Sequence, residues 1–201
     1  MRLVYITGEY TYTNFKAHTV KERTQNEDFV YLEEHNPCWQ TWYEQESASL
    51  KKVFAPDHVC KIEHYGSTAV SGLIAKPIIG ILIGLHNVHL TNQEIAQLQL
   101  LGYCQVPTPN RLSQCSYWKK QTERKFNLAI VHYDSQYWHD HLAIRDYLRT
   151  HSDQIHNYAT IKMQAIKEGF CTKESYRAYK QPFLNNLFLK AKQWQQSGNG
   201  S

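Results

Sequence analysis

The residues of this chain best suited to chemistry surround one glycine-serine pair, Gly66-Ser67. Residues 63–73 read Glu-His-Tyr-Gly-Ser-Thr-Ala-Val-Ser-Gly-Leu, and Ala-Lys-Pro-Ile-Ile follows at 75–79. This pattern predicts a strand, a tight turn that opens a short helix, a break at proline, and then a buried strand. Such a turn can present backbone N–H groups to an anion, because glycine lets the backbone approach closely and serine adds a hydroxyl donor. It is a candidate phosphate site, and the alternative is a plain strand-to-helix turn.

Other polar side chains could complete such a site. His64 could bond to a phosphate or fix the turn, and Lys76 could pair with a phosphate or be a solvated lysine before a proline. Arg145 and Arg149 follow His141 at helical spacing, which predicts a basic ridge. The two arginines could clamp a phosphate or carboxylate bidentately, or form structural salt bridges. The candidate ligand-binding residues are His64, Gly66, Ser67, Thr68, Lys76, Arg145 and Arg149.

The elements that must position these residues are predicted from apolar periodicity and helix caps. Residues 78–85 are apolar on both faces, as in a central strand packed between layers. Residues 91–94, Thr-Asn-Gln-Glu, form a capping box. Strands are expected at 59–63, 78–85, 115–119 and 126–132, and helices at 36–56, 91–102, 137–150, 152–167 and 173–194, the last with a break at Pro182.

Length and composition indicate one domain. At 201 residues and 42% hydrophobic content the chain can bury a substantial core without needing a second one. We expect this domain over residues 29–195, an N-terminal extension over 1–28 that is an edge strand or an arm, and a flexible tail over 196–201.

Charge and cysteine content narrow the partners and the compartment. The formal charge of +4 is mild and the basic residues are scattered, which suits a small anionic ligand and does not call for nucleic acid. Five cysteines without a C-x-x-C pair indicate reduced thiols. The longest apolar run, 78–85, is much shorter than a membrane span. We expect a soluble, cytoplasmic protein with no membrane partner, and the oligomeric state is not predicted.

Several ordered segments together resemble the GrpB (UPF0157) family. They are Trp39 in an N-terminal helix, residues 63–79, the strand 126–131, Arg-Asp-Tyr-Leu-Arg at 145–149, and a final block with Tyr158, Lys162, Tyr176, Lys180 and Phe183. The resemblance implies an α/β (α+β) fold of the nucleotidyltransferase type, a small mixed sheet flanked by helices with a helical C-terminal half. Some members of this family are fused to dephospho-CoA kinases. The tyrosines and Phe183 are interpreted as core residues, the alternative being a stacking platform for a nucleotide base.

Two departures from the family pattern bear on catalysis. Nucleotidyl transfer normally uses two Mg²⁺ ions held by carboxylates on adjacent strands. Family members typically read Lys-Pro-Ile-Ile-Asp where this chain ends on Gly80, and His-Leu-His where it has Asn-Leu-Ala at 127–129. No Asp or Glu lies between Glu63 and Glu94, and Leu82 stands where a second carboxylate is expected. The sequence therefore predicts no metal ligands, although Mg²⁺ remains possible as a cofactor, and the catalytic residues are unknown.

Histidine does not supply a replacement metal site. His132, His139 and His141 are near one another in the sequence, but the spacing of His139 and His141 does not put both rings on one helical face. No cysteine or second acid joins them at a zinc-like interval.

Three functions are consistent with these observations. The first is a nucleotide-binding or phosphate-binding protein with a degenerate metal site and weak or no transferase activity, in effect a pseudoenzyme. The second is an active Mg²⁺-dependent nucleotidyltransferase that draws on other carboxylates, Glu63 with Asp134 or Asp146. The third is a protein-interaction or folding-helper domain, suggested by the kinase fusions.

Overall fold

The computed structural model describes residues 4–5, 29–107 and 115–199. Within them the chain forms two compact units. The sheet unit comprises residues 37–71 and 77–145, and the helical unit comprises the described part of 1–36 with 72–76 and 146–199. Each unit is thus assembled from segments that are distant in the sequence, and the domain expected over 29–195 includes parts of both.

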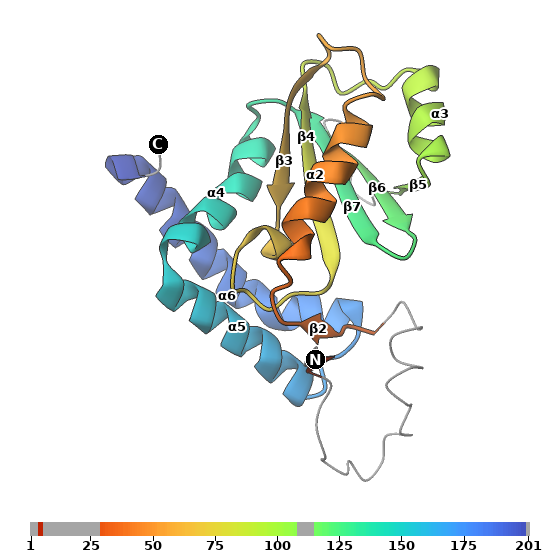
Figure 1. Ribbon diagram of the computed structural model, residues 1–201. Helices are drawn as coiled ribbons and strands as arrows, with labels where there is room; N and C mark the ends of the chain where they lie inside the picture. Colours follow the sequence, from red (N-terminus) through yellow and green to blue (C-terminus); the bar gives the residue numbers. More distant parts are fainter. Residues whose placement is uncertain (1–3, 6–28, 108–114, 200–201) are drawn as a thin grey trace. The chain divides into compact units, whose positions relative to one another are not determined.

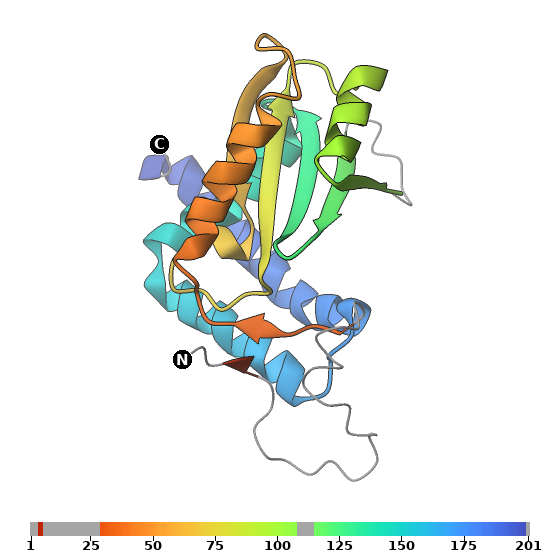
Figure 2. The ribbon, with the colours of Figure 1, turned by 45° about the vertical axis from the view of Figure 1, so that its right-hand side comes forward.

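A mixed sheet of five strands forms the centre of the sheet unit (Figures 1 and 2). The strand order is β3, β4, β7, β6, β5. Strands β4 and β7 pair in parallel, and every other neighbouring pair is antiparallel. The strands are β3 (Val59–Tyr65), β4 (Ile78–Leu85), β5 (Tyr103–Val106), β6 (Cys115–Gln121) and β7 (Lys125–His132). The predicted small mixed sheet is confirmed, whereas β5 was missed because four residues are too few to show a period.

Helices cover both faces of this sheet (Figure 2). On one face lies α2 (Cys38–Leu50), where Tyr43 stacks on His64 at 4.8 Å between ring centroids. On the other face lies the start of α4 (Gln136–Thr150), where Trp138 packs against Leu82. The helix predicted to run to Pro56 ends at Leu50, and turns fill the interval.

A partly buried ion pair joins the residue before β3 to α3 (Asn92–Leu100). The predicted capping box is confirmed: the Glu94 amide donates to Thr91 Oγ1 at 3.2 Å, and the Thr91 amide donates to the Glu94 carboxylate at 2.8 Å. Glu94 also accepts from His58 Nδ1 at 2.7 Å, while His58 Nε2 donates to the Asn87 carbonyl at 2.5 Å. Because both ring nitrogens face acceptors, the imidazolium form is favoured.

In the helical unit, α5 (Ser152–Lys167) and α6 (Lys173–Trp194) lie side by side (Figure 1). Strand β1 (Val4–Tyr5) pairs with β2 (Leu32–Glu33), and Glu33 bridges to Ala75. No helix among the described residues is both long and apolar enough to cross a membrane. Helices α5 and α6 confirm the predicted helical C-terminal half.

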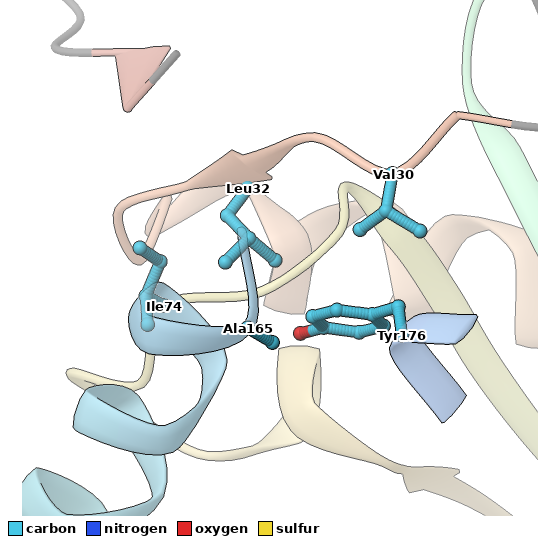
Figure 3. Close-up of a cluster of buried hydrophobic side chains, with 5 residues drawn as sticks. All are labelled: Val30, Leu32, Ile74, Ala165 and Tyr176. Atoms are coloured by element: carbon cyan, nitrogen blue, oxygen red, sulfur yellow. The ribbon is translucent and has the colours of Figure 1, made fainter. Parts of the chain in front are cut away.

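The core of the helical unit draws on four separate parts of the chain (Figure 3). Side chains from the N-terminal strand region, from the segment 72–76 and from the two long helices pack together. They are Val30, Leu32, Ile74, Ala165 and Tyr176. This cluster fixes the 72–76 segment and the start of α6 to the same core.

The predicted break at Pro182 is wrong, since α6 runs through it. Proline removes one backbone N–H and so one hydrogen bond to the carbonyl four residues earlier. Tyr176 and Leu187, buried on either side of Pro182, hold the flanking turns in place.

Parts of the expected terminal segments fall outside the described residues. Of the extension over 1–28, the structure describes only Val4–Tyr5, which pair as a strand. Of the tail over 196–201, residues 196–199 continue α6 through a π-type turn with a φ of +79° at Gly198.

We predict that His58→Gln lowers the free energy of unfolding by about 1.5–3 kcal/mol at acidic pH, because it removes charge-assisted hydrogen bonds. Burial alone would lower the pKa of His58, but the bonds to Glu94 and Asn87 outweigh it and raise that pKa. The stabilisation is therefore complete below the unfolded pKa of about 6.5 and is lost as pH rises through the folded-state value. Urea titrations of both proteins at about pH 5.5 and about pH 9 measure this.

The exposed His89 provides the control, and His89→Gln should track the wild type at both pH values. A difference between His58→Gln and wild type that stays constant with pH would contradict the assignment.

Candidate functional site

The turn after β3 has the predicted layout. Gly66 has φ 77° and ψ −168°, a backbone region open essentially to glycine alone, and the short 3₁₀ helix η1 (Ser67–Ala69) follows. The amides of Ala69 and Val70 donate to the carbonyls of Gly66 and Ser67, both at 3.2 Å. Gly66 is exposed and Ser67 is partly exposed, so the turn lies at the surface of the sheet unit.

Buried side chains anchor this turn. His64 is 3% exposed, and its Nε2 lies 3.0 Å from Thr68 Oγ1. Its Nδ1 lies 3.3 Å from Gln40 Oε1 on α2. Thr68 Oγ1 in turn donates to the carbonyl of Ile78 at 3.3 Å. Two of the candidate ligand-binding residues, His64 and Thr68, thus tie β3, η1 and β4 together from the inside.

Gly80 is required by the backbone of the same turn. It pairs with Tyr65 across the antiparallel β3–β4 ladder. A Cβ atom at position 80 would lie 2.4 Å from the Tyr65 carbonyl oxygen, far inside van der Waals contact. The position at which family members typically carry aspartate therefore cannot accept any side chain unless the backbone moves.

The four positions at which the sequence lacks the expected metal-binding side chains lie opposite one another on β4 and β7, as two pairs. In the parallel register, Gly80 faces Asn127 and Leu82 faces Ala129. Leu82 and Ala129 are fully buried and pack with Val131. Among the described residues, no group of three or more His, Cys, Asp or Glu is placed to hold a metal ion. Of these four positions only Asn127 carries a side-chain oxygen, whereas a two-metal site needs several oxygen ligands.

Aromatic rings pack against Leu82 and Ala129 on the same face. His141 stacks on Tyr137 at 3.9 Å between centroids and lies 5.5 Å from the Tyr65 ring. Its Nδ1 donates to the Tyr137 carbonyl at 2.9 Å. Burial lowers the pKa of His141 to about 4, and Asp140 offsets this only in part. His141 is uncharged at neutral pH, so the predicted basic ridge lacks its first member.

Arg145 forms an ion pair inside the sheet unit. Its Nη1 donates to Glu63 Oε2 at 2.6 Å and to the His64 carbonyl at 3.0 Å. Lys61 contacts the other Glu63 oxygen at 2.9 Å. Burial raises the pKa of Glu63, but the hydrogen bonds from Lys61 and Arg145 outweigh it and hold that pKa below its usual value. Arg145 thus has the salt-bridge role left open by the sequence, with Glu63 as its partner.

The remaining candidates belong to the helical unit. Arg149 Nη1 lies 3.8 Å from Asp146 Oδ1 one turn away, and its side chain is 42% exposed. Lys76 lies at the end of the 72–76 segment, with its Nζ 6.0 Å from the centre of the Tyr176 ring.

Sequence reasoning overlooked two lysines beside Lys76. Lys162 and Lys180 entered only as matches to the family pattern, yet the structure gathers them around Tyr158 and Tyr176. The signal was present, because α5 and α6 each contain tyrosine followed four residues later by lysine. On a helix that spacing places the two side chains on one face.

We predict that Gly80→Ala and Gly80→Asp each destabilise the protein, by about 1–3 kcal/mol for the alanine, because a Cβ there meets fixed backbone. Gly66→Ala should also cost about 1–3 kcal/mol, through backbone conformation alone, since nothing lies within 4 Å of its Cβ position. Thermal unfolding with and without Mg²⁺ measures both effects. A Mg²⁺-dependent rise in the melting temperature of Gly80→Asp would show that the aspartate restores a metal site and would contradict this account.

We predict that Arg145→Met costs about 3 kcal/mol, because it leaves the partly buried Glu63 beside a single exposed lysine. Arg149→Met, one turn further along the same helix, should change the stability by less than about 0.5 kcal/mol. Chemical denaturation of the two variants makes the comparison. Equal losses in both would mean that the Glu63 pair contributes no more than a surface ion pair.

Comparison with known proteins indicates the family of this chain. The family model described as "GrpB protein" matches residues 29–190. The UPF0157 protein YqkA of Bacillus subtilis is 28% identical over 171 residues, covering 83% of this chain and 48% of that protein, so the chain spans about half of that relative. The glutamate-rich protein GrpB of Alkalihalophilus pseudofirmus is 28% identical over 175 residues, covering 81% of this chain and 95% of that protein.

A solved structure agrees with these sequence matches. The crystal structure of the conserved protein GrpB from Enterococcus faecalis superposes with a TM-score of 0.70 at 29% identity, covering 81% of this chain and 99% of that one. Because the family model spans most of the chain, this protein belongs to the GrpB family.

Proposed function

We propose that this GrpB-family protein binds a nucleotide or another small phosphorylated molecule at the Gly66-Ser67 turn. The observation that carries the proposal is the turn itself. Gly66 has a backbone conformation that only glycine adopts readily, and Ser67 follows it, partly exposed, at the start of η1. The buried bond between His64 and Thr68 holds this geometry before any ligand arrives. A preformed turn of this kind orders little on binding, which favours affinity.

We further propose that this protein, although its fold is of the nucleotidyltransferase type, has weak or no nucleotidyl-transfer activity. Transfer of this kind needs metal ions that neutralise charge on the pyrophosphate leaving group. Mg²⁺ takes oxygen ligands at about 2.0–2.1 Å, and glycine, leucine and alanine side chains offer none. The pairing of Gly80 with Asn127 and of Leu82 with Ala129 supports loss of the metal site.

The non-standard carboxylates considered for an active enzyme have other roles in this structure. Both Glu63 oxygens lie in ion pairs, with Lys61 and Arg145. Asp134 contacts His139 at 2.7 Å, with its own side chain 71% exposed. Because Glu63 and Asp134 already contact basic side chains, they do not favour the active-enzyme alternative over the binding role.

We predict that ATP, GTP, CTP or UTP at millimolar concentration raises the melting temperature without Mg²⁺. A ligand that binds only the native state stabilises it by mass action, by about 2.7 kcal/mol at a concentration one hundred times its Kd. Ser67→Ala should reduce the shift. Ser71→Ala, an exposed serine just after η1, is the matched control and should keep it.

The outcomes separate the candidate functions. A shift that requires Mg²⁺, together with nucleotide transfer that Ser67→Ala abolishes, would establish an active enzyme and overturn the proposal. No shift with any of the four nucleotides would also overturn it, and the protein-interaction role would then take its place.

A further inference from the structure

Three lysines of the helical unit gather around two buried tyrosine rings. Lys162 Nζ lies 4.2 Å from the centre of the Tyr158 ring. Lys180 Nζ lies 4.2 Å from the Tyr176 ring and 5.8 Å from the Tyr158 ring. Lys76 Nζ lies 6.0 Å from the Tyr176 ring. The three ammonium groups come from three separate segments, so only the folded chain brings them together.

The surroundings of this lysine cluster are rigid and apolar. Tyr176 is 2% exposed and belongs to the hydrophobic cluster that also contains Ile74 and Ala165 (Figure 3). Phe183 stacks on Tyr158 at 5.4 Å between ring centroids. Side chains whose rotamers are locked by packing position their neighbours precisely enough for ligand binding.

Lys162 is itself almost fully buried, at 2% exposed. Its Nζ donates to the Ile74 carbonyl at 2.7 Å. That bond alone would explain Lys162 as a brace for the 72–76 segment. It does not explain why Lys180 and Lys76 stand beside it.

Like charges lie close together in this cluster. Burial lowers the pKa of Lys162 far below its usual value, and the charges of Lys180 and Lys76 lower it further. Burial likewise lowers the pKa of Lys180 to about 8, with Lys76 and Arg177 adding to the effect. Cation–π contacts with the rings offset part of this repulsion. Like charges gathered in a low-dielectric region are stabilised most by an anion placed between them.

We propose that Lys76, Lys162 and Lys180 form a binding site for a phosphate group, either a phosphate monoester or a pyrophosphate, with Tyr158 and Tyr176 as its walls. Lysine ammonium groups match an anion that carries two or more charges, and a bound anion favours the protonated form of Lys162. The tetrahedral oxygens of phosphate can accept bonds from donors on three sides, whereas a carboxylate offers two oxygens in one plane. The proposal rests on the helical unit alone and does not depend on ligand binding at the Gly66-Ser67 turn.

The test uses the full chain with inorganic phosphate, pyrophosphate and ATP, at constant ionic strength set with potassium chloride. Calorimetry gives the Kd, and thermal unfolding gives the stability. Pyrophosphate should raise the wild-type melting temperature. Lys180→Met keeps the apolar stem and removes the charge, and it should raise the Kd at least tenfold. Without an anion, this variant should melt at the wild-type temperature or above, because a like charge has been removed.

Lys167→Met, an exposed position on α5, is the matched control and should bind pyrophosphate like the wild type. Lys76→Met tests the third lysine without touching the bond to Ile74. If Lys180→Met and Lys76→Met bind pyrophosphate and ATP as well as Lys167→Met does, the proposal is wrong. A Lys180→Met variant that melts lower but binds normally would assign the lysines a structural role and would also overturn it.

Comparing pyrophosphate with ATP identifies the source of the phosphate. Comparing Ser67→Ala with the methionine variants separates the two proposed sites. Binding of pyrophosphate that the Met variants lose indicates a free oxyanion, whereas loss confined to ATP indicates a phosphate carried by a nucleotide. Ser67→Ala should leave pyrophosphate binding unchanged. Failure of the turn proposal would thus appear in the serine variant, and failure of the lysine proposal in the methionine variants.

Discussion

The parallel pairing of β4 with β7 determines what each face of the sheet unit contains. Strand β4 is buried along nearly its whole length, and its residues alternate between the two faces. Ile79, Ile81 and Ile83 share one face, and Gly80, Leu82 and Gly84 share the other. A slip of one residue in this register would move every side chain to the opposite face. The residues that each covering helix meets, and the pairing of positions 80 with 127 and 82 with 129, follow from it.

One close backbone contact, between Tyr65 and Gly80, underlies both the turn after β3 and the absence of a carboxylate at position 80. The carbonyl of Tyr65 approaches position 80 so closely that only glycine fits there. The backbone conformation of Gly66 then turns the chain into η1 from this close approach. An aspartate at position 80 would push the two strands apart where the turn begins. Glycine at position 80 therefore allows this particular turn.

Charged side chains have different neighbours in the two units. In the sheet unit, buried or half-buried charges meet opposite charges, as for Arg145 with Glu63, Lys120 with Glu46, and His58 with Glu94. Such pairs hold elements together and leave little attraction for a ligand. In the helical unit, three lysines share two aromatic rings, and the charges that lower the pKa of Lys162 are those of other lysines. Like charges gathered in a confined region favour the recognition of an anion.

The sequence by itself determined those features that depend on near neighbours. A continuous apolar run placed β4 at 78–85, and helical patterns placed α5 at 152–167 and α6 at 173–194. The capping box at Thr91 located the start of α3. The absence of acids between Glu63 and Glu94 was equally readable. These succeed because local propensity and side-chain periodicity act over a few residues, which a single sequence displays directly.

Tertiary structure decided the remainder. The neutral state of His141, the choice of Glu63 as the partner of Arg145, and the clash that excludes a side chain at Gly80 each depend on a strand or helix far away in the chain. The lysine cluster shows this most clearly, because Lys76, Lys162 and Lys180 meet only after the 72–76 segment packs against two helices. Burial and the distances between charges are properties of packing between distant segments, and no local pattern encodes them.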